Sequence, residues 1–462
     1  MLQIDRARTP RDLAPALANL FAISAGKIRS VEAGWRAEDG APVFTSGGRY
    51  VARGWTEWTQ GFQFGSAILQ FDATGDEEFL ELGRARTVER MAPHVSHVGV
   101  HDHGFNNVST YGNLWRLARE GRMGASAWEV HFYEIALKVS GAIQARRWTK
   151  IPGGGFIYSF NGRHSLFVDT VRSLRALALA HRLGHRLSEE QDAQISLLER
   201  LLQHAKATAD YSVYHGRGRD RYDERGRVAH ESMFNADNGT YRGPSTQQGY
   251  TPFSTWTRGL AWAMLGFAEE LEFVATLDDE ALELYGGRQA IEHWMLEAAR
   301  ATNDFYIDHA AASDGVPYWD TGAPGLAAVG EWQRRPADPF NDHEPVDSSA
   351  AAIGAQGLLR LGRVLDQRRE DGSKYTQAGL RVLATLIDPD GPYLSRDHSH
   401  QGLLLHAIYH RPNGWDTIPP GSKIPRGESC QWGDYHLREA ALYVKRLAEG
   451  GRYLTFFGPT GT

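Results

Sequence analysis

The chain has 462 residues and a formal net charge of −6, with 23% charged and 42% hydrophobic residues. This composition can fill a large core, which excludes a disordered chain. The 50 Lys and Arg residues are outnumbered by 56 Asp and Glu residues, so there is no basic surplus of the kind that binds nucleic acid. The single cysteine, Cys430, excludes a disulfide framework and a cysteine-based zinc site.

In chain order, the sequence predicts a series of long helices joined by turns rich in Gly, Pro and Asp. Strand signals are few and short. The resulting expectation is an all-α fold of about twelve helices in a single domain, residues 1–462, closed into a ring of helix pairs whose inner helices begin at a funnel. Two helical subdomains are the alternative. The expected helices cover residues 76–91, 165–183, 188–207, 254–271, 279–301, 348–365, 374–387 and 434–448.

Two segments rich in Pro and Gly, residues 322–346 and 411–429, lie between expected helices and contain Trp332, Phe340 and Trp415. Linkers rarely carry large aromatic side chains, so these segments are predicted to be ordered loops that pack over a site.

The N-terminal residues are charged and lack the apolar region of a signal peptide. No stretch approaches the roughly 18 uncharged apolar residues that a membrane-spanning helix needs. We therefore expect a cytoplasmic protein without a membrane partner. A periplasmic protein whose leader has been removed is the alternative.

The aromatic content is high, with 13 Trp, 18 Tyr and 19 Phe. Flat side chains with a hydrogen-bonding edge are surfaces on which sugar rings stack. A large aromatic core is the other interpretation, and composition alone favours it. Polar and aromatic residues gather at the starts of expected helices, in residues 55–62, 101–106, 165–170, 247–262, 347–350 and 431–435.

Asp169 and Asp102 form an acid and base pair in outline. Asp169 follows the apolar residues Leu166 and Val168, and desolvation there is predicted to raise its pKa and keep it protonated. A helix cap or a buried ion pair is the alternative for this residue. Asp102 stands between two histidines and before a glycine, so we expect it to be solvated and ionised.

Arg258 and Trp262 share one face of the expected helix, so a guanidinium and an indole can border one pocket. Arginine holds a carboxylate with two parallel hydrogen bonds, which makes Arg258 a candidate anion ligand. The alternative is a structural ion pair with Asp347 or Asp434. Trp58, Trp256 and Trp262 can equally belong to the core.

The sequence lacks the motifs of several other kinds of site. Histidines cluster in residues 94–103 and 398–410, but neither cluster contains the His-Glu-x-x-His spacing of a zinc hydrolase. Residues 153–155 are three glycines without the Lys and Ser or Thr of a phosphate loop, and a Gly-x-Ser-x-Gly elbow is absent. We therefore expect no metal and no cofactor.

The ordered set of motifs resembles the unsaturated glucuronyl hydrolases, and less completely the unsaturated rhamnogalacturonyl hydrolases. The resemblance spans about residues 50–445, and its most specific part is Ser-Thr-Trp-x-Arg-Gly-x-Ala-Trp at residues 254–262. The further motifs are Trp-Thr-Gln-Gly-Phe at 58–62, His-Asp-His-Gly-Phe at 101–105, Val-Asp-Thr at 168–170, Gln-Gly at 248–249, Tyr-Trp-Asp at 318–320, Asp-Ser-Ser-Ala at 347–350 and Trp-Gly-Asp-Tyr at 432–435.

The resemblance implies an (α/α)6 barrel and a glycoside hydrolase that releases the terminal 4,5-unsaturated uronic acid from oligosaccharides made by polysaccharide lyases. Its reaction hydrates the C4=C5 vinyl ether instead of displacing at the anomeric carbon. By resemblance, Asp169 is the general acid and base and Asp102 is the second essential aspartate. The substrate-binding positions implied or suggested are Trp58, His101, Phe160, His230, Gln248, Trp256, Arg258 and Trp262, with Arg258 assigned to the uronate carboxylate from its expected geometry.

The chain departs from the family pattern at Gln247, where the family usually has His, at Gln63, where it has an aromatic residue, and near Phe160, which replaces a tryptophan. The segment 415–429 does not resemble the family segment that reads the leaving sugar. Three alternatives stay open: activity like that of a rhamnogalacturonyl hydrolase, a conventional glycosidase acting on saturated sugars, and a sugar-binding protein without catalysis.

Overall fold

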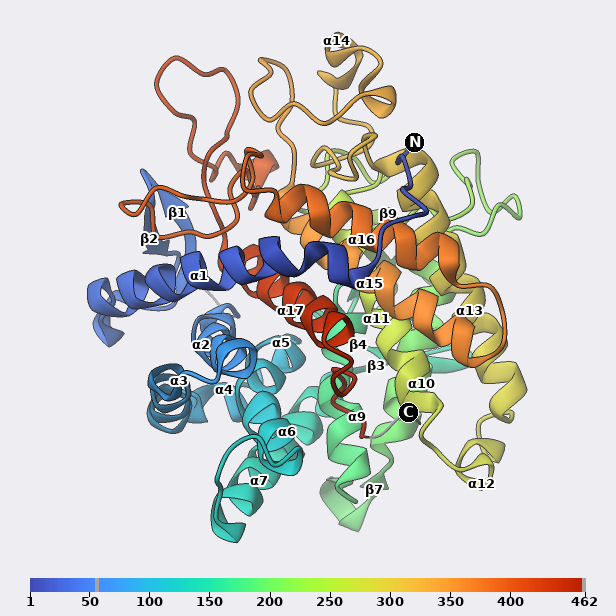
Figure 1. Cartoon of the computed structure of the whole chain (residues 1–462). Helices are drawn as coiled ribbons and strands as arrows, with labels where there is room; N and C mark the ends of the chain where they lie inside the picture. The colour runs from blue at the N-terminus through green and yellow to red at the C-terminus, as the bar shows by residue number, and fades with distance from the viewer. Residues whose placement is uncertain (55–57, 459–462) are drawn as a thin grey trace.

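The computed structural model describes residues 1–54 and 58–458, and its inner helices form a closed ring (Figure 1). Neighbouring inner helices contact one another, and the last of them, α17, packs against the first, α2. These helices are buried on almost every side, so their sequences are apolar or charge-paired all round. The inner helices are α2 (Gln60–Thr74), α5 (His103–Asn107), α6 (Asn113–Arg119), α8 (Thr170–Ser173), α9 (Arg175–Arg182), α11 (Thr257–Val274), α15 (Ser348–Gln367) and α17 (Gln431–Ala448).

An outer layer of helices, each with one buried face, covers this ring, and α3, α7 and α13 lie at the periphery in Figure 1. The two layers make an α/α barrel, which confirms the predicted fold class. Across residues 1–54 and 58–458, no helix is both long enough and apolar enough to cross a bilayer. The outer helices are α1 (Ala14–Gly34), α3 (Glu77–Arg90), α7 (Ala127–Arg146), α10 (Leu197–Ala207), α13 (Arg288–Phe305) and α16 (Ser373–Ile387), and three shorter helices are α4 (Ala92–Val95), α12 (Asp279–Glu283) and α14 (Leu326–Val329).

The described strands are short and antiparallel, and one three-stranded sheet bears directly on the candidate site. In that sheet β8 (Glu231–Phe234) pairs with both β5 (Ser165–Phe167) and β9 (Tyr241–Ser245). The register places Phe167 opposite Glu231, which brings the residues after β5 close to those before β8. The two-stranded sheets are β1 (Pro42–Ser46) with β2 (Arg49–Ala52), β3 (Trp148–Ile151) with β4 (Gly154–Ile157), and β6 (Leu187–Ser188) with β7 (Gln194–Ile195).

Three helix predictions were wrong in their extent. Residues 165–167 form β5, because their partners in β8 lie more than sixty residues away, where local periodicity carries no information. The helix expected from residue 188 begins instead at α10, where the Ser196 hydroxyl accepts a hydrogen bond from the Glu199 amide. The helix expected over 279–301 is divided into α12 and α13 by Gly286 and Gly287, whose φ angles are 98° and 84°.

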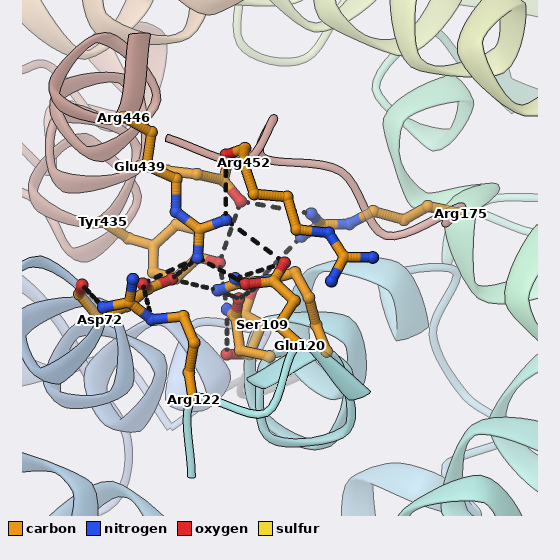
Figure 2. A network of polar contacts seen from close by, with 11 residues as sticks. Asp72, Ser109, Glu120, Arg122, Arg175, Tyr435, Glu439, Arg446 and Arg452 are labelled. Carbon is orange, nitrogen blue, oxygen red and sulfur yellow. Dashed lines mark hydrogen bonds and ion pairs between the residues drawn. The ribbon is translucent and has the colours of Figure 1, made fainter. Parts of the chain in front are cut away.

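A buried charge network joins the two ends of the ring, as Figure 2 shows. Arg446 of α17 donates to both carboxylate oxygens of Asp72 in α2, each at 2.8 Å, and to Glu120 at 2.7 Å. Arg116 of α6 donates to Asp72 at 2.7 Å. Burial by itself raises the pKa of Asp72, but the charges of Arg116 and Arg446 bring that pKa below its usual value. The network thus ties α17 to α2 and α6 through fully paired charges.

Candidate active site

An inner cavity lies at the end of the barrel where the inner helices begin. Trp58 precedes α2, Asp102 and Asp169 hold the residue positions before α5 and α8, and Trp256 holds that position before α11. The lining residues are Trp58, His101, Asp102, Phe105, Phe160, Asp169, Gln247, Gln248, Trp256, Arg258, Trp262, Tyr409, His410 and Trp415.

Every site residue that the sequence predicted lines the inner cavity except His230. His230 lies behind the cavity wall, where its ring packs 4.6 Å from Phe167 and 4.7 Å from Trp256. Its Nδ1 accepts a hydrogen bond from the backbone amide of Gln247 at 3.0 Å. Burial lowers the pKa of His230 to about 4, so the ring is neutral near pH 7.

His101 contacts both aspartates through one ring nitrogen. Its Nε2 lies 3.3 Å from Asp169 Oδ1 and 3.6 Å from Asp102 Oδ1. Burial alone lowers the pKa of His101, but the two carboxylates together raise it above its usual value. The pKa values of the three side chains therefore depend on one another.

The expected order of the two aspartate pKa values was wrong. Asp102 is buried, and burial raises its pKa to about 6. Burial also raises the pKa of Asp169, but the contact with His101, the charge of that ring, and the His230 and Arg258 charges lower it below its usual value. The reversal follows from His101, which is closer to Asp169, and from Arg258, which adds positive charge on the Asp169 side.

Two polar atoms of this trio have unmet hydrogen-bonding capacity. Within the described parts of the chain, Asp169 Oδ1 and His101 Nδ1 are buried without a hydrogen-bond partner, the 3.3 Å contact of Asp169 lacking the alignment of a hydrogen bond. Buried polar atoms without a partner are uncommon in proteins, and a polar ligand in the cavity can satisfy them.

Arg258 makes its hydrogen bonds within the protein itself, whereas the sequence predicted a two-point clamp for a carboxylate. Its Nη1 donates to Asp347 at 3.1 Å and to the carbonyl of Ile408, and its Nη2 donates to Gln248 and to the carbonyl of Tyr409, each at 2.7 Å. All four Nη protons are thus in use. The ion pair with Asp347, one of the alternatives from the sequence, is the arrangement found.

The tryptophan side chains that line the inner cavity also belong in part to the core. Trp58 stacks on Trp432 with ring centroids 4.9 Å apart and planes at 24°. Trp262 is fully buried and packs 4.9 Å from Phe105, and it also lines the cavity. These tryptophans therefore serve both as core residues and as the wall of the cavity, because the same rings fill the core and line the cavity.

Sequence reasoning missed Tyr409 and His410, and it assigned no site role to Trp415, which it expected only in an ordered loop over a site. These residues enter the cavity from the segment before α17, and only tertiary contacts place them there. The available signal in the sequence was Trp415, an aromatic residue inside the Pro- and Gly-rich segment 411–429. Within residues 1–54 and 58–458, no three His, Cys, Asp or Glu side chains converge as metal ligands.

Comparisons with known proteins agree with one another. No family model matches the chain. It is 26% identical over 418 residues to an unsaturated glucuronyl hydrolase from Bacillus sp. (strain GL1), covering 88% of this chain and 90% of that protein. It is 25% identical over 416 residues to an unsaturated chondroitin disaccharide hydrolase from Streptococcus pyogenes, covering 88% and 85%.

Solved structures show the same fold. The crystal structure of the unsaturated glucuronyl hydrolase from Bacillus sp. GL1 superimposes with a TM-score of 0.69 at 23% identity, covering 94% of this chain and 96% of that one. An unsaturated glucuronyl hydrolase specific for heparin superimposes with a TM-score of 0.70 at 19% identity, covering 94% and 98%.

Proposed function

We propose, from the premise that the chain belongs to the unsaturated glucuronyl hydrolase family, that it is a glycoside hydrolase acting on oligosaccharides that end in a 4,5-unsaturated uronic acid. The observation that carries the proposal is the trio of Asp102, His101 and Asp169 at the wall of a tryptophan-lined cavity. This arrangement supplies a proton, a base and stacking surfaces for a sugar ring in one place.

In the proposed reaction, the proton starts on His101, and Asp169 is ionised in the resting site. A uronate carboxylate entering the cavity adds negative charge, which raises the pKa of Asp169. The proton then passes from His101 Nε2 to Asp169 across the 3.3 Å contact. Asp102, whose pKa burial raises to about 6, contacts the same nitrogen of His101 and tunes how firmly the ring holds that proton.

Protonated Asp169 adds its proton to C4 of the unsaturated sugar, and positive charge develops at C5 and the ring oxygen. Water adds at C5 and returns a proton to the Asp169 carboxylate. The hemiketal so formed opens to a ketone at C5, and the resulting hemiacetal at C1 expels the remaining sugar as an alcohol. Asp169 is then protonated again. When the uronate product leaves, the proton passes back to His101, so the cycle ends in the resting protonation states and no other group is consumed.

Arg258 has a positioning role in this proposal. It holds Gln248 and the carbonyls of residues 408 and 409, so it fixes one wall of the inner cavity. Gln248 is then the group on this wall with amide donors that can face the sugar. Trp58, Phe160, Trp256 and Trp262 supply the flat surfaces.

We further propose that the chain works as one catalytic domain in the cytoplasm. The main cluster of buried apolar residues extends from Leu2 to Phe457, which supports a single domain. The partner in this proposal is the unsaturated oligosaccharide, with no metal or cofactor in the chemistry.

The test is the loss of ultraviolet absorbance of the C4=C5 bond when the protein is incubated with lyase-digested polysaccharides. We expect turnover by the unchanged protein and none by Asp169→Asn, which keeps the shape of the side chain but cannot deliver the proton. The variant should still bind the substrate. Near-normal kcat in Asp169→Asn contradicts the assignment.

The other functions give different results in the same panel. Release of aryl alcohol from saturated aryl glycosides, without loss of absorbance from lyase products, supports a conventional glycosidase. Turnover confined to pectic lyase products supports activity like that of a rhamnogalacturonyl hydrolase. Binding of lyase products without any turnover supports a sugar-binding protein.

A further inference from the structure

A second cavity, called here the outer cavity, has a volume of about 570 Å³ and adjoins the inner one. The two cavities share Gln247, His410 and Trp415. The remaining lining residues of the outer cavity are Arg53, Thr246 and Asn413. Asp169 lines the inner cavity but not the outer one. An oligosaccharide whose terminal sugar reaches Asp169 therefore extends outward through the outer cavity.

Arg53 is the charged member of this lining, and it is exposed. Its Cζ lies 4.4 Å from the centre of the Trp415 ring and 5.8 Å from that of Phe44. Within the described parts of the chain, no carboxylate lies within ion-pairing distance of its guanidinium. Stacking on Trp415 therefore orients a cation whose hydrogen-bond donors remain available to a ligand.

The loop that carries Trp415 is held in place from within. The Asp416 carboxylate accepts hydrogen bonds from the backbone amides of Tyr409 at 2.5 Å and His410 at 3.0 Å. Trp415 packs 4.6 Å from the His410 ring and 5.3 Å from Tyr409. The wall is thus formed before a ligand arrives, which reduces the entropy lost on binding.

The other side chains of the outer cavity are uncharged. Thr246, Gln247 and Asn413 offer hydroxyl and amide groups, which suit the hydroxyl groups of a sugar. His410 has a pKa lowered to about 4 by burial, so it is neutral near pH 7, and its Nδ1 is buried without a hydrogen-bond partner in the described part of the chain. The positive charge of this space therefore comes from Arg53.

We propose that the outer cavity binds the leaving sugar and selects one that carries an anionic substituent, with the sugar ring against Trp415 and the anion on Arg53. This inference rests on the proposed function, since it assumes that the terminal sugar occupies the inner cavity. A sulfate ester and a carboxylate offer the same recognition chemistry, namely oxygen atoms that accept paired hydrogen bonds from a guanidinium.

The experiment compares three unsaturated disaccharides: one whose leaving sugar is N-acetylgalactosamine, one with the same sugar sulfated at O6, and one whose leaving sugar is a hexuronate. For the unchanged protein we expect kcat/KM to be about tenfold higher for at least one charged substrate than for the neutral one. In Arg53→Gln this ratio should fall to about 1, and in Arg53→Lys it should fall only in part because the charge stays.

Arg49→Gln is the matched control, because Arg49 is also an exposed arginine, belongs to the neighbouring strand β2 and does not line either cavity. It should keep the tenfold ratio. Raising the salt concentration to 0.5 M should shrink the ratio of the unchanged protein, since the anion site is open to solvent. A preference for only one of the two charged substrates identifies which anion the site takes.

Equal kcat/KM for all three substrates, or equal losses on all three in Arg53→Gln, overturns the inference while leaving the proposed function intact. Absence of turnover on every substrate counts against the proposed function instead. A binding measurement then decides the outer cavity separately: tryptophan fluorescence of Asp169→Asn is titrated with the neutral and sulfated disaccharides, with and without Arg53→Gln. Equal affinities, or no binding, with Arg53 present overturn the inference.

Discussion

At the scale of single residues, His101 decides how the two aspartates differ. Both carboxylates are buried, and burial alone raises the pKa of each. Their difference arises because the His101 ring lies 3.3 Å from one and 3.6 Å from the other, and because Arg258 and His230 act on Asp169. Which neighbour a side chain faces is a property of the fold, so residue types alone predicted a contrast but reversed its sign.

We predict that Asp102→Asn moves the alkaline side of the pH profile to lower pH. Asp102 helps to raise the pKa of His101, so removing its charge lets the ring lose its proton earlier as the pH rises. The alkaline limb of kcat/KM should shift down by about one pH unit. Each profile is scaled to its own maximum, so that a lower kcat does not hide the shift.

Asp320→Asn is the control for this shift. Asp320 is another buried aspartate whose pKa burial raises to about 6, but it lies outside the trio. Its variant should keep the alkaline limb in place. A reduced kcat in Asp102→Asn with an unmoved limb argues that Asp102 acts without tuning His101.

Arg258 is the residue whose observed contacts differ most from those that the sequence predicted. We predict that Arg258→Lys lowers the free energy of unfolding by about 2 kcal/mol, because an ammonium cannot replace the hydrogen bonds to Asp347, Gln248 and two carbonyls. KM should rise several-fold as Gln248 loses its support. Denaturant unfolding and steady-state kinetics measure the two effects.

Gln248→Ala separates the two roles of Arg258. It removes the cavity-facing partner and keeps the buried ion pair with Asp347, so KM should rise while the free energy of unfolding changes by less than about 1 kcal/mol. An unchanged stability in Arg258→Lys shows that the ion pair is not needed for folding.

At the scale of elements, one glycine sets the distance between the helices that carry the two aspartates. Gly104 lies in α5, and a Cβ atom at this position would stand 2.1 Å from the backbone oxygen of Ser173 in α8. The Gly104 amide donates to the Ser173 hydroxyl at 2.8 Å. Asp102 and Asp169 immediately precede these two helices, so this close approach also fixes the geometry of the trio.

We predict that Gly104→Ala lowers the free energy of unfolding by about 3 kcal/mol and reduces kcat, since backbone must move to admit the methyl group. Gly26→Ala is the control: Gly26 lies within α1, and its Cβ would meet no atom within 4 Å. It should raise the free energy of unfolding by about 0.5–1 kcal/mol. A tolerated Gly104→Ala with normal kcat contradicts the close-packing argument.

The elements themselves were predictable where capping and apolar spacing act locally. Helices α15 and α16 lie close to the expected ranges 348–365 and 374–387, and α15 is capped by the Asp347 side chain. The extent of helix α2 was not predicted, because all of its residues except the last are buried and it has no polar face to give a helical period. The strand β5 was missed because strand pairing is a long-range contact.

At the scale of the whole molecule, the ring is closed by contacts between its last and first members. Helix α17 packs on α2, and Arg446 links Asp72 to Glu120 across this closure (Figure 2). Each inner helix is buried by both of its neighbours, so the loss of one pair exposes the faces of two others. Cooperative behaviour follows from that geometry.

We predict that the chain unfolds in urea as one transition. Far-ultraviolet circular dichroism, which reports helices, and tryptophan fluorescence, which reports the inner cavity and core, should give the same midpoint. Two separated midpoints contradict the single domain proposed for residues 1–462 and support the alternative of two helical subdomains.

The sequence by itself determined the helical class, the family motifs and the residue types gathered at the helix starts, because periodicity, capping and motif spacing are local properties of the chain. It also determined that two aspartates of contrasting character belong to one site. Only the tertiary structure decided which aspartate holds its proton more tightly, what Arg258 binds, and that Tyr409, His410 and Trp415 complete the cavity. Charge, burial and hydrogen bonding act through space, and the distances that govern them are set when segments far apart in the chain close into one barrel.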